Sequence, residues 1–318
     1  MTSCRAVKIA LLGAWIIAGL LWLGPASFSQ NPPPSNKTTP APANYNPDDY
    51  VGQDVCKVCH AEKFTNFSHT AHAKLALLPD RTAADRGCEA CHGPGRAHVN
   101  AAGDKTKIRS FKGESAKELS EACLRCHAGK EEHNNYRRGE HWRNDVGCTS
   151  CHDPHPAAAA AQRMLVRREP QLCLTCHGEI KAQFAKPFHH RVPEGAMKCS
   201  DCHNPHGGFE LKQVRQTTGA DGPCLKCHTN LQGPFTFEHP PVKVEGCTIC
   251  HTPHGASNPK LLRRNQVRQL CLECHSNVGN TVAPTTPVFH NLADVRFQNC
   301  TTCHVKIHGS NTDHYFLR

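Results

Sequence analysis

The sequence is short of the residues that build a conventional hydrophobic core. Only 6% of its 318 residues are aromatic, and the 38% counted as hydrophobic include all 21 cysteines. No run alternates polar and apolar residues as a half-buried strand would, and glycine and proline interrupt the chain every few residues. These shortages argue against a large β-sheet protein and against a compact two-layer domain.

The N-terminus has an apolar run that is too short for an ordinary membrane span. Residues 9–23 are apolar, follow Arg5 and Lys8, and precede small residues suited to cleavage. Residues 1–29 are therefore predicted to be a cleaved export signal, with an uncleaved anchor as the alternative. Cys4 lies ahead of the apolar run, so we expect it to be lost with the signal.

What the sequence has in abundance is one five-residue word, Cys-x-x-Cys-His, which occurs ten times. This is the attachment signature of c-type haem, in which both thiols bond to the porphyrin and the histidine takes one axial position on iron. Zinc ribbons also use Cys-x-x-Cys, but a histidine in the fifth place of all ten copies argues against them. Export fits haem attachment outside the cytoplasm, where free thiols would risk forming disulfides.

The ten haem words account for twenty cysteines and ten histidines. The predicted thioether positions are Cys56, Cys59, Cys88, Cys91, Cys123, Cys126, Cys148, Cys151, Cys173, Cys176, Cys199, Cys202, Cys224, Cys227, Cys247, Cys250, Cys271, Cys274, Cys300 and Cys303. The predicted proximal iron ligands are His60, His92, His127, His152, His177, His203, His228, His251, His275 and His304.

Ten covalently bound haem c groups would change the balance of apolar surface and charge. Their porphyrins would supply the apolar surface that the side chains lack, so folding should depend on the cofactor. The formal net charge is +10, whereas ten haems bring about twenty propionate carboxylates. Arginine and lysine then serve as propionate partners, and no nucleic-acid partner is expected.

The words fall into five pairs, and the last four pairs recur at close to fifty residues. The predicted fold is that of a multihaem cytochrome c: mostly coil with short α-helices, almost no β-structure, and an elongated array of five two-haem repeats. A Pro-rich disordered linker is expected at residues 30–50 and the decahaem domain at residues 51–318. The repeats are predicted at about residues 51–98, 115–155, 165–206, 215–254 and 261–308.

Secondary structure is expected to be sparse. Ser115 and Glu118 form the pattern of a capping box, which predicts a short helix running into Cys123. Residues 157–168 are a second helix candidate on propensity. Each haem word is expected to form a single helical turn.

Fourteen histidines lie outside the words, and the repeat indicates which of them bind iron from the distal side. One set follows each second word, and a histidine three residues beyond the proximal one cannot reach the opposite face of its own iron. We therefore predict that this set binds the first haem of its own pair: His98, His155, His206, His254 and His308. The other set lies between the two words of a pair and is assigned to the second haem: His72, His141, His190, His239 and His290.

Four histidines are left as spares, namely His69, His133, His189 and His314. The choices between His69 and His72, and between His189 and His190, stay open. Two imidazoles on each iron would leave no position for a substrate, and no word ends in lysine as a catalytic one often does. The chain is therefore predicted to be an electron carrier without catalytic residues.

Several stretches resemble the periplasmic decahaem cytochromes of porin–cytochrome conduits, of the Mtr and Dms types. The stretches are the Cys88 word with Gly93-Pro94-Gly95, Pro187-Phe188-His189-His190 leading to the Cys199 word and Asn204-Pro205-His206-Gly207, residues 233–242, and His308-Gly309-Ser310-Asn311. Arg191 departs from the family pattern, in which proline more often follows the double histidine, and the Pro-rich linker is a second departure. The resemblance runs from about residue 51 to the C-terminus.

The resemblance implies paired imidazole ligation and a role in carrying electrons across the periplasm and outer membrane for extracellular or anaerobic respiration. The implied partners are an outer-membrane β-barrel porin, a periplasmic or inner-membrane quinol-linked cytochrome, and an extracellular multihaem cytochrome or reductase. A soluble periplasmic or extracellular electron shuttle is the alternative function. A multihaem reductase is a third possibility, which an iron lacking a sixth protein ligand would favour.

Overall fold

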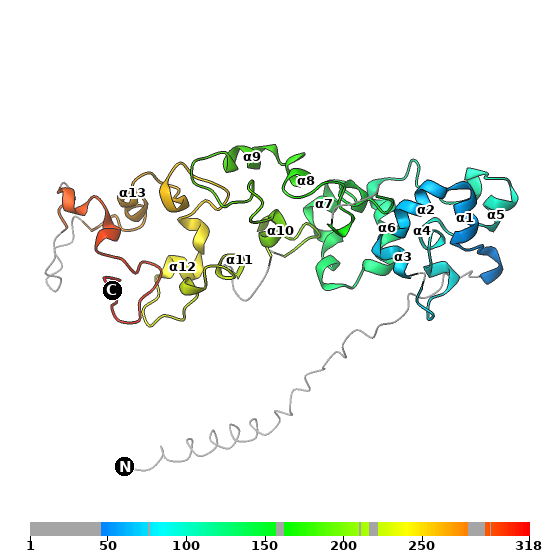
Figure 1. Cartoon of the computed structure of the whole chain (residues 1–318). Helices are drawn as coiled ribbons and strands as arrows, with labels where there is room; N and C mark the ends of the chain where they lie inside the picture. The colour runs from blue at the N-terminus through cyan, green and yellow to red at the C-terminus, as the bar shows by residue number, and fades with distance from the viewer. Residues whose placement is uncertain are drawn as a thin grey trace, which may run out of the picture. The chain divides into compact units, whose positions relative to one another are not determined.

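The computed structural model describes residues 46–75, 77–156, 162–209, 211–215, 222–278, 290–292 and 294–318. They belong to one unit, Ala41–Arg318, in which short helices are joined by coil (Figure 1). Within these ranges the β-structure consists of five isolated antiparallel bridges. The predicted fold class, mostly coil with short helices and almost no β-structure, is confirmed. The predicted export signal lies outside the described residues.

The helices are short, and the longest, α6, has 12 residues. The α-helices are α1 (Gln53–Cys59), α2 (Ala61–Ser68), α3 (Ala71–Leu75), α4 (Glu89–His92), α5 (Arg96–Asn100), α6 (Ala116–His127), α7 (Glu140–Arg143), α8 (Gln171–Leu174), α9 (Gly178–Phe184), α10 (Cys199–Cys202), α11 (Gly222–Leu225), α12 (Pro240–Val244) and α13 (Val267–Leu272). The 3-10 turns are η1 (Pro47–Asp49), η2 (Ala83–Asp85), η3 (Lys105–Lys107), η4 (Glu131–His133), η5 (Tyr136–Arg138), η6 (Cys148–Ser150), η7 (Gln162–Met164), η8 (Leu211–Gln213), η9 (Thr229–Leu231), η10 (Cys247–Ile249), η11 (Pro259–Leu261), η12 (Val295–Phe297) and η13 (Cys300–Thr302).

Each haem word begins on a helical turn, as predicted. In nine words the backbone N–H of the histidine donates to the carbonyl of the first cysteine, with N···O distances of 2.8–3.0 Å. The tenth word, at Cys123, forms the last turn of α6. One turn of helix places side chains at positions i, i+3 and i+4 on the same face, so both thiols and the imidazole of a word point to one side.

The predicted capping box is confirmed at the start of α6. The Ser115 hydroxyl accepts a hydrogen bond from the Glu118 backbone N–H, and the Glu118 carboxylate accepts one from the Ser115 backbone N–H. This reciprocal pair satisfies two donors that a helix start otherwise leaves free.

The helix predicted over residues 157–168 does not form in its described part. Residues 157–161 lie outside the described residues, and only Gln162–Met164 makes a 3-10 turn. Arg163 and Met164 are both left-handed, and Leu165 pairs with His152 in an isolated bridge. Hydrogen bonds back to the Cys148 word therefore replace the helical bonds that propensity favours.

The end of the predicted disordered linker is ordered. Residues 46–50 are described, and Pro47–Asp49 forms η1, capped by the Asn46 side chain. The Arg96 guanidinium donates to the carbonyl oxygens of Asp48 and Tyr50. These bonds hold the chain against α5, so residues 46–50 of the predicted linker belong to the folded unit.

Few apolar side chains are buried, in agreement with the composition. Among the described residues the buried hydrophobic ones are Phe67, Ala84, Leu124, Tyr136, Phe184, Val192 and Ala256. Polar side chains take part of the structural role. Ser120, which is fully buried, donates to the Ala116 carbonyl and accepts from the Cys148 N–H, so it joins α6 to the next haem word.

Glu89 is the most heavily bonded of these polar anchors. It lies inside the Cys88 word and is only 3% exposed. Its carboxylate accepts hydrogen bonds from the backbone N–H groups of Val51, Gly52 and Gly95, at 2.8–3.0 Å. The start of the folded unit is thus attached to the second haem word by one side chain.

We expect Glu89→Ala to lower the free energy of unfolding of the haem-loaded protein by at least about 3 kcal/mol, because three backbone donors lose a charged acceptor. Urea unfolding followed by far-ultraviolet circular dichroism measures the change. The control is Glu62→Ala, which removes the same charge from an exposed position. Equal unfolding midpoints for the two variants would contradict the anchoring role.

Candidate haem sites

Each of the ten histidines of the haem words has one partner imidazole at a nearly constant distance. Ring centroids in these ten pairs lie 6.0–6.4 Å apart. Two metal–imidazole bonds of about 2 Å, with about 1 Å from each nitrogen to its ring centre, require about 6 Å. The side chains of each pair therefore fit an iron ion held between them.

The facing partners are the ten histidines predicted as distal ligands, and none is a spare. The pairs, with the histidine of the haem word first, are His60 with His98, His92 with His155, His127 with His72, His152 with His206, His177 with His141, His203 with His254, His228 with His190, His251 with His308, His275 with His239, and His304 with His290.

The predicted assignment of distal histidines within their own pair is wrong for eight of the ten. Only His98, which faces His60, and His290, which faces His304, lie where they were expected. At each boundary between repeats, one distal histidine from either repeat instead faces a haem-word histidine of the other repeat. His155 of the second repeat faces His92 of the first, for example, and His72 of the first repeat faces His127 of the second.

At the last two of the four boundaries, backbone bridges between neighbouring repeats favour this exchange. Phe188 of the third repeat pairs with Ala256 of the fourth, and Phe237 of the fourth pairs with Ser310 of the fifth. Distal histidines lie two residues away from each bridge, one on either strand, as His190 and His254 do at the first bridge. Each therefore enters the neighbouring repeat more readily than its own.

Glycines after the distal histidines allow the repeats to approach this closely. A Cβ atom on Gly207 would lie 2.4 Å from the Asn135 oxygen, and one on Gly255 would lie 2.2 Å from the Gln183 oxygen. Both oxygens belong to the preceding repeat. Real Cβ atoms do not approach backbone so closely, so any larger residue would force the two repeats apart.

The second ring nitrogen of several distal histidines is also bound across the boundary. Nδ1 of His141 lies 2.8 Å from the Pro205 carbonyl oxygen, and Nδ1 of His190 lies 2.7 Å from that of Pro253. His239 also interacts with the backbone of Ile307 across a boundary. Since a carbonyl only accepts, His141 and His190 carry hydrogen on Nδ1 and leave Nε2 free for a metal.

Burial keeps several of these imidazoles neutral. It lowers the pKa of His127 to about 4 and that of His206 to about 4. An imidazole binds a metal only in its neutral form. The lowered pKa values therefore favour ligation at ordinary pH.

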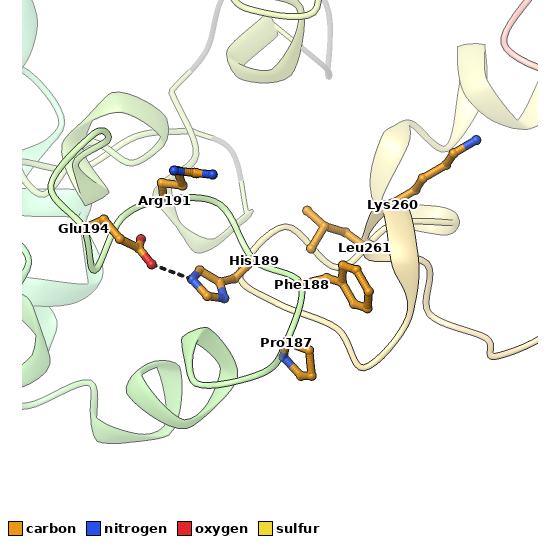
Figure 2. Close-up of a pocket in the computed structure, with 7 residues that line it drawn as sticks. All are labelled: Pro187, Phe188, His189, Arg191, Glu194, Lys260 and Leu261. Carbon is orange, nitrogen blue, oxygen red and sulfur yellow. Dashed lines mark hydrogen bonds and ion pairs between the residues drawn. The ribbon is translucent and has the colours of Figure 1, made fainter.

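The spare histidines lie in other surroundings. Both ring nitrogens of His189 are engaged: Nδ1 lies 2.7 Å from the Lys186 carbonyl oxygen and Nε2 lies 3.0 Å from the Glu194 carboxylate (Figure 2). The Glu194 carboxylate raises the pKa of His189. His69 is exposed at the end of α2, and His314 packs on Tyr315. Of the open choices His69/His72 and His189/His190, only His72 and His190 face a histidine of a haem word.

His133 is the spare that lies closest to the paired histidines. Its ring centroid is 5.3 Å from that of His127 and 4.4 Å from that of His206. Both separations are shorter than the roughly 6 Å that an iron between two imidazoles needs. It therefore packs beside two sites without completing either.

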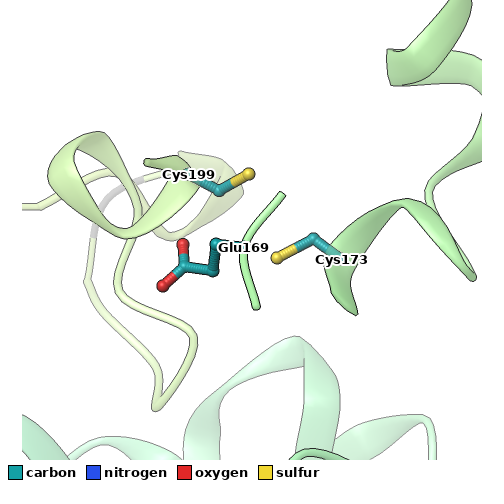
Figure 3. A group of neighbouring side chains, drawn as sticks. All are labelled: Glu169, Cys173 and Cys199. Atoms are coloured by element: carbon teal, nitrogen blue, oxygen red, sulfur yellow. The ribbon is translucent and has the colours of Figure 1, made fainter. Parts of the chain in front are cut away.

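The first cysteines of the two words in a repeat lie close together. Thiol contacts join Cys56 to Cys88, Cys123 to Cys148, and Cys271 to Cys300. Cys173 and Cys199 approach in the same way beside Glu169, with their ligand atoms within 4.8 Å of one another (Figure 3). In the described residues this is the only group of three or more such ligands, and it lacks the fourth donor of a zinc ribbon.

The Glu169 carboxylate has a structural partner of its own. It accepts hydrogen bonds from the backbone N–H and the hydroxyl of Ser200, both at 2.9 Å. It thus holds the start of α10 beside the preceding word. We interpret the group as two neighbouring haem-attachment edges and not as a separate metal site.

No helix within the described residues has the length and apolar character that crossing a membrane requires.

Two family models match the chain. The model of the doubled CXXCH motif matches residues 141–182, 189–233 and 239–280, and the model of cytochrome c554 and c-prime matches residues 96–153. Each doubled-motif match covers the second word of one repeat and the first word of the next, and so spans a boundary where distal histidines are exchanged. The fold, the haem words and these matches define a multihaem c-type cytochrome, which binds haem c covalently and transfers electrons.

A curated relative narrows this class. Over 281 residues the chain is 34% identical to the multihaem cytochrome MtrA of Shewanella baltica (strain OS185), which covers 85% of this chain and 81% of the relative. The chain belongs to the MtrA family of multihaem cytochromes, as its resemblance to the Mtr type indicated.

We expect Gly255→Ala to separate the third and fourth repeats and open the site formed by His203 and His254. The haem of that site should change from low spin to high spin in the ferric electron paramagnetic resonance spectrum, and the haem between His190 and His228 should also be disturbed, because the Pro253 carbonyl of the same loop binds His190. Gly178→Ala is the matched control, because a Cβ there has no atom within 4 Å. A fully low-spin Gly255→Ala protein would show that the close approach is not needed for ligation.

Proposed function

We propose that the chain holds ten covalently attached haems, each with its iron between the two imidazoles of a facing pair, and uses them only to carry electrons. The observation that carries this proposal is the set of ten pairs at 6.0–6.4 Å. Two nitrogen ligands fill both axial positions, so no iron is free to bind and activate a substrate. A reductase would need such an open position.

Haem-to-haem transfer within the chain is supported by the thiol contacts between paired words. The porphyrin edges attached at Cys56 and Cys88, or at Cys173 and Cys199, would lie beside each other. The exchanged histidines then join each repeat to the next. Electrons would pass through five two-haem repeats, at about residues 51–98, 115–155, 165–206, 215–254 and 261–308.

We further propose that the protein works in the periplasm, associated with the outer membrane inside a β-barrel porin. Its partners would be a periplasmic or inner-membrane quinol-linked cytochrome on one side and an extracellular multihaem cytochrome or reductase on the other. The family likeness and the export signal expected at residues 1–29 support this location. The role would be extracellular or anaerobic respiration.

The His189 and His190 pair offers a matched test of the ligand assignment. His190→Ala should convert one haem, that of His228, to high spin, because its second nitrogen is lost. His189→Ala should leave every haem low spin, since both nitrogens of His189 are bound elsewhere. Ferric electron paramagnetic resonance and intact-mass measurement of the haem adducts provide the readouts.

The opposite result, a high-spin haem in His189→Ala alone, would reverse the assignment. High-spin haem in the unmodified protein would count against paired ligation and favour a reductase.

The location is tested by a detergent pull-down of the full chain from outer membranes, with haem staining and mass spectrometry of the bound proteins. We expect a β-barrel protein to accompany the chain. Recovery only in the soluble periplasmic fraction, without such a partner, would favour the shuttle.

A further inference from the structure

In most facing pairs, an imidazole also uses the ring nitrogen that points away from its partner, and that nitrogen forms a hydrogen bond. In eight of the ten sites at least one imidazole has its Nδ1 atom at a backbone oxygen, and in a ninth site His239 interacts with the backbone of Ile307. The eight acceptors are Asp104 for His98, Arg109 for His92, Arg163 for His152, Pro205 for His141, Lys212 for His203, Pro253 for His190, Lys260 for His251 and Tyr315 for His304.

Three of these acceptors are held by unusual backbone conformations. Arg163, Lys212 and Lys260 have φ values of 64°, 57° and 55°, and the residue after each is left-handed as well. Non-glycine residues rarely adopt this region, and two in succession cost free energy. The same geometry recurs with three different residue pairs, which indicates that the carbonyl position itself is what the fold requires.

The local hydrogen bonds of these three turns are also the same. The residue after the proximal histidine donates to the second turn residue, as Thr252 does to Leu261, at 2.8 Å. Arg263 then donates back to the Cys250 carbonyl. Figure 2 shows Lys260 and Leu261 on the opposite side of a surface hollow from Pro187 and His189. Each turn thus folds back onto its haem word and fixes the imidazole.

The site formed by His72 and His127 is the exception. Nδ1 of His127 is buried and has no hydrogen-bond partner. Among the described residues His72 has no backbone acceptor for its second ring nitrogen either. The neighbouring ring of His133 offers no help, because its own Nδ1 is buried and unpartnered too.

A bound Nδ1–H makes an imidazole more basic and a stronger electron donor to its metal. Stronger donation stabilises ferric over ferrous iron and so lowers the reduction potential, and hydrogen bonds to the axial ligands are a recognised determinant of that potential. Resting on the paired ligation proposed above, we infer that the His72–His127 site has the highest reduction potential of the ten haems. It would be the first to accept an electron and the last to release one.

A positive charge beside this site acts in the same direction. Lys130 lies within electrostatic reach of both His72 and His127. A cation near a haem disfavours the ferric form, which carries one more positive charge than the ferrous form. Electrostatics and the missing hydrogen bond therefore agree.

The test changes the potential of one haem by substituting its ligand. A redox titration of the full, haem-loaded chain, followed by haem absorbance, then shows at which potential that haem is normally reduced. Methionine raises the potential of a haem when it replaces an axial histidine. Each haem contributes about a tenth of the absorbance change during reduction. We expect His72→Met to shift the tenth that is reduced first to a still more positive potential. The other nine tenths should keep their potentials. His190→Met is the matched control. It should shift a tenth of the absorbance change that belongs to the haems reduced later, which we call the body of the curve.

Two findings would overturn the inference: a His72→Met component taken from the body of the curve, or a His190→Met component taken from its leading edge. The near-infrared charge-transfer band of methionine-ligated ferric haem verifies each substitution. Ten haems per chain with low-spin spectra in the unmodified protein test the proposed function separately, so its failure is distinguishable.

A second variant keeps the inference testable if methionine does not bind. Lys130→Gln removes a charge without touching a ligand and should shift only the leading tenth, toward more negative potential. Lys112→Gln, at another exposed position, should leave the curve unchanged. An unchanged leading tenth in Lys130→Gln would count against the inference.

Discussion

The exchange of imidazoles between neighbouring repeats is the interaction on which the rest of the structure depends. At each of the four boundaries, one histidine from either side enters the other repeat, as His190 and His254 do between the third and fourth repeats. Eight of the ten sites therefore need two repeats to be complete. A repeat cannot assemble its sites alone, and its neighbours become part of its own fold, as in other repeat proteins whose units are stabilised by their interfaces.

This constraint compensates for the small apolar core. The buried hydrophobic residues, such as Leu124 and Phe184, are few among the described residues and scattered along them. Order is supplied instead by short-range polar anchors, of which Glu89 and Ser120 are examples, and by side-chain pairs shaped for a metal. A chain of this kind couples folding to its cofactor, because the apolar surface that ordinarily drives collapse arrives with the porphyrin.

The sequence was sufficient to predict the haem words, the sparse secondary structure and which ten histidines face them. It was not sufficient to predict the pairing. A histidine such as His206 cannot reach the iron of the haem word that it follows, so that haem is excluded. The sequence does not show which of the neighbouring haems it binds instead. The choice is made by long-range contacts, including the approach of Gly207 to Asn135, which no local pattern reveals. Propensity failed over residues 162–168 for the same reason, since bonds to the Cys148 word decide that conformation.

The loops that carry out the exchange also determine the surroundings of the ligands. In the third repeat His206 faces His152, while the carbonyl before it, that of Pro205, holds His141 at another site. Pro253 and His254 act in the same way one repeat later. One loop therefore serves two sites, and a shift in it would disturb both. At the first boundary His155 faces His92, but in the described residues the Pro154 carbonyl holds no imidazole. The distinct surroundings of the His72–His127 site thus follow from a loop that supplies a ligand without the accompanying hydrogen bond.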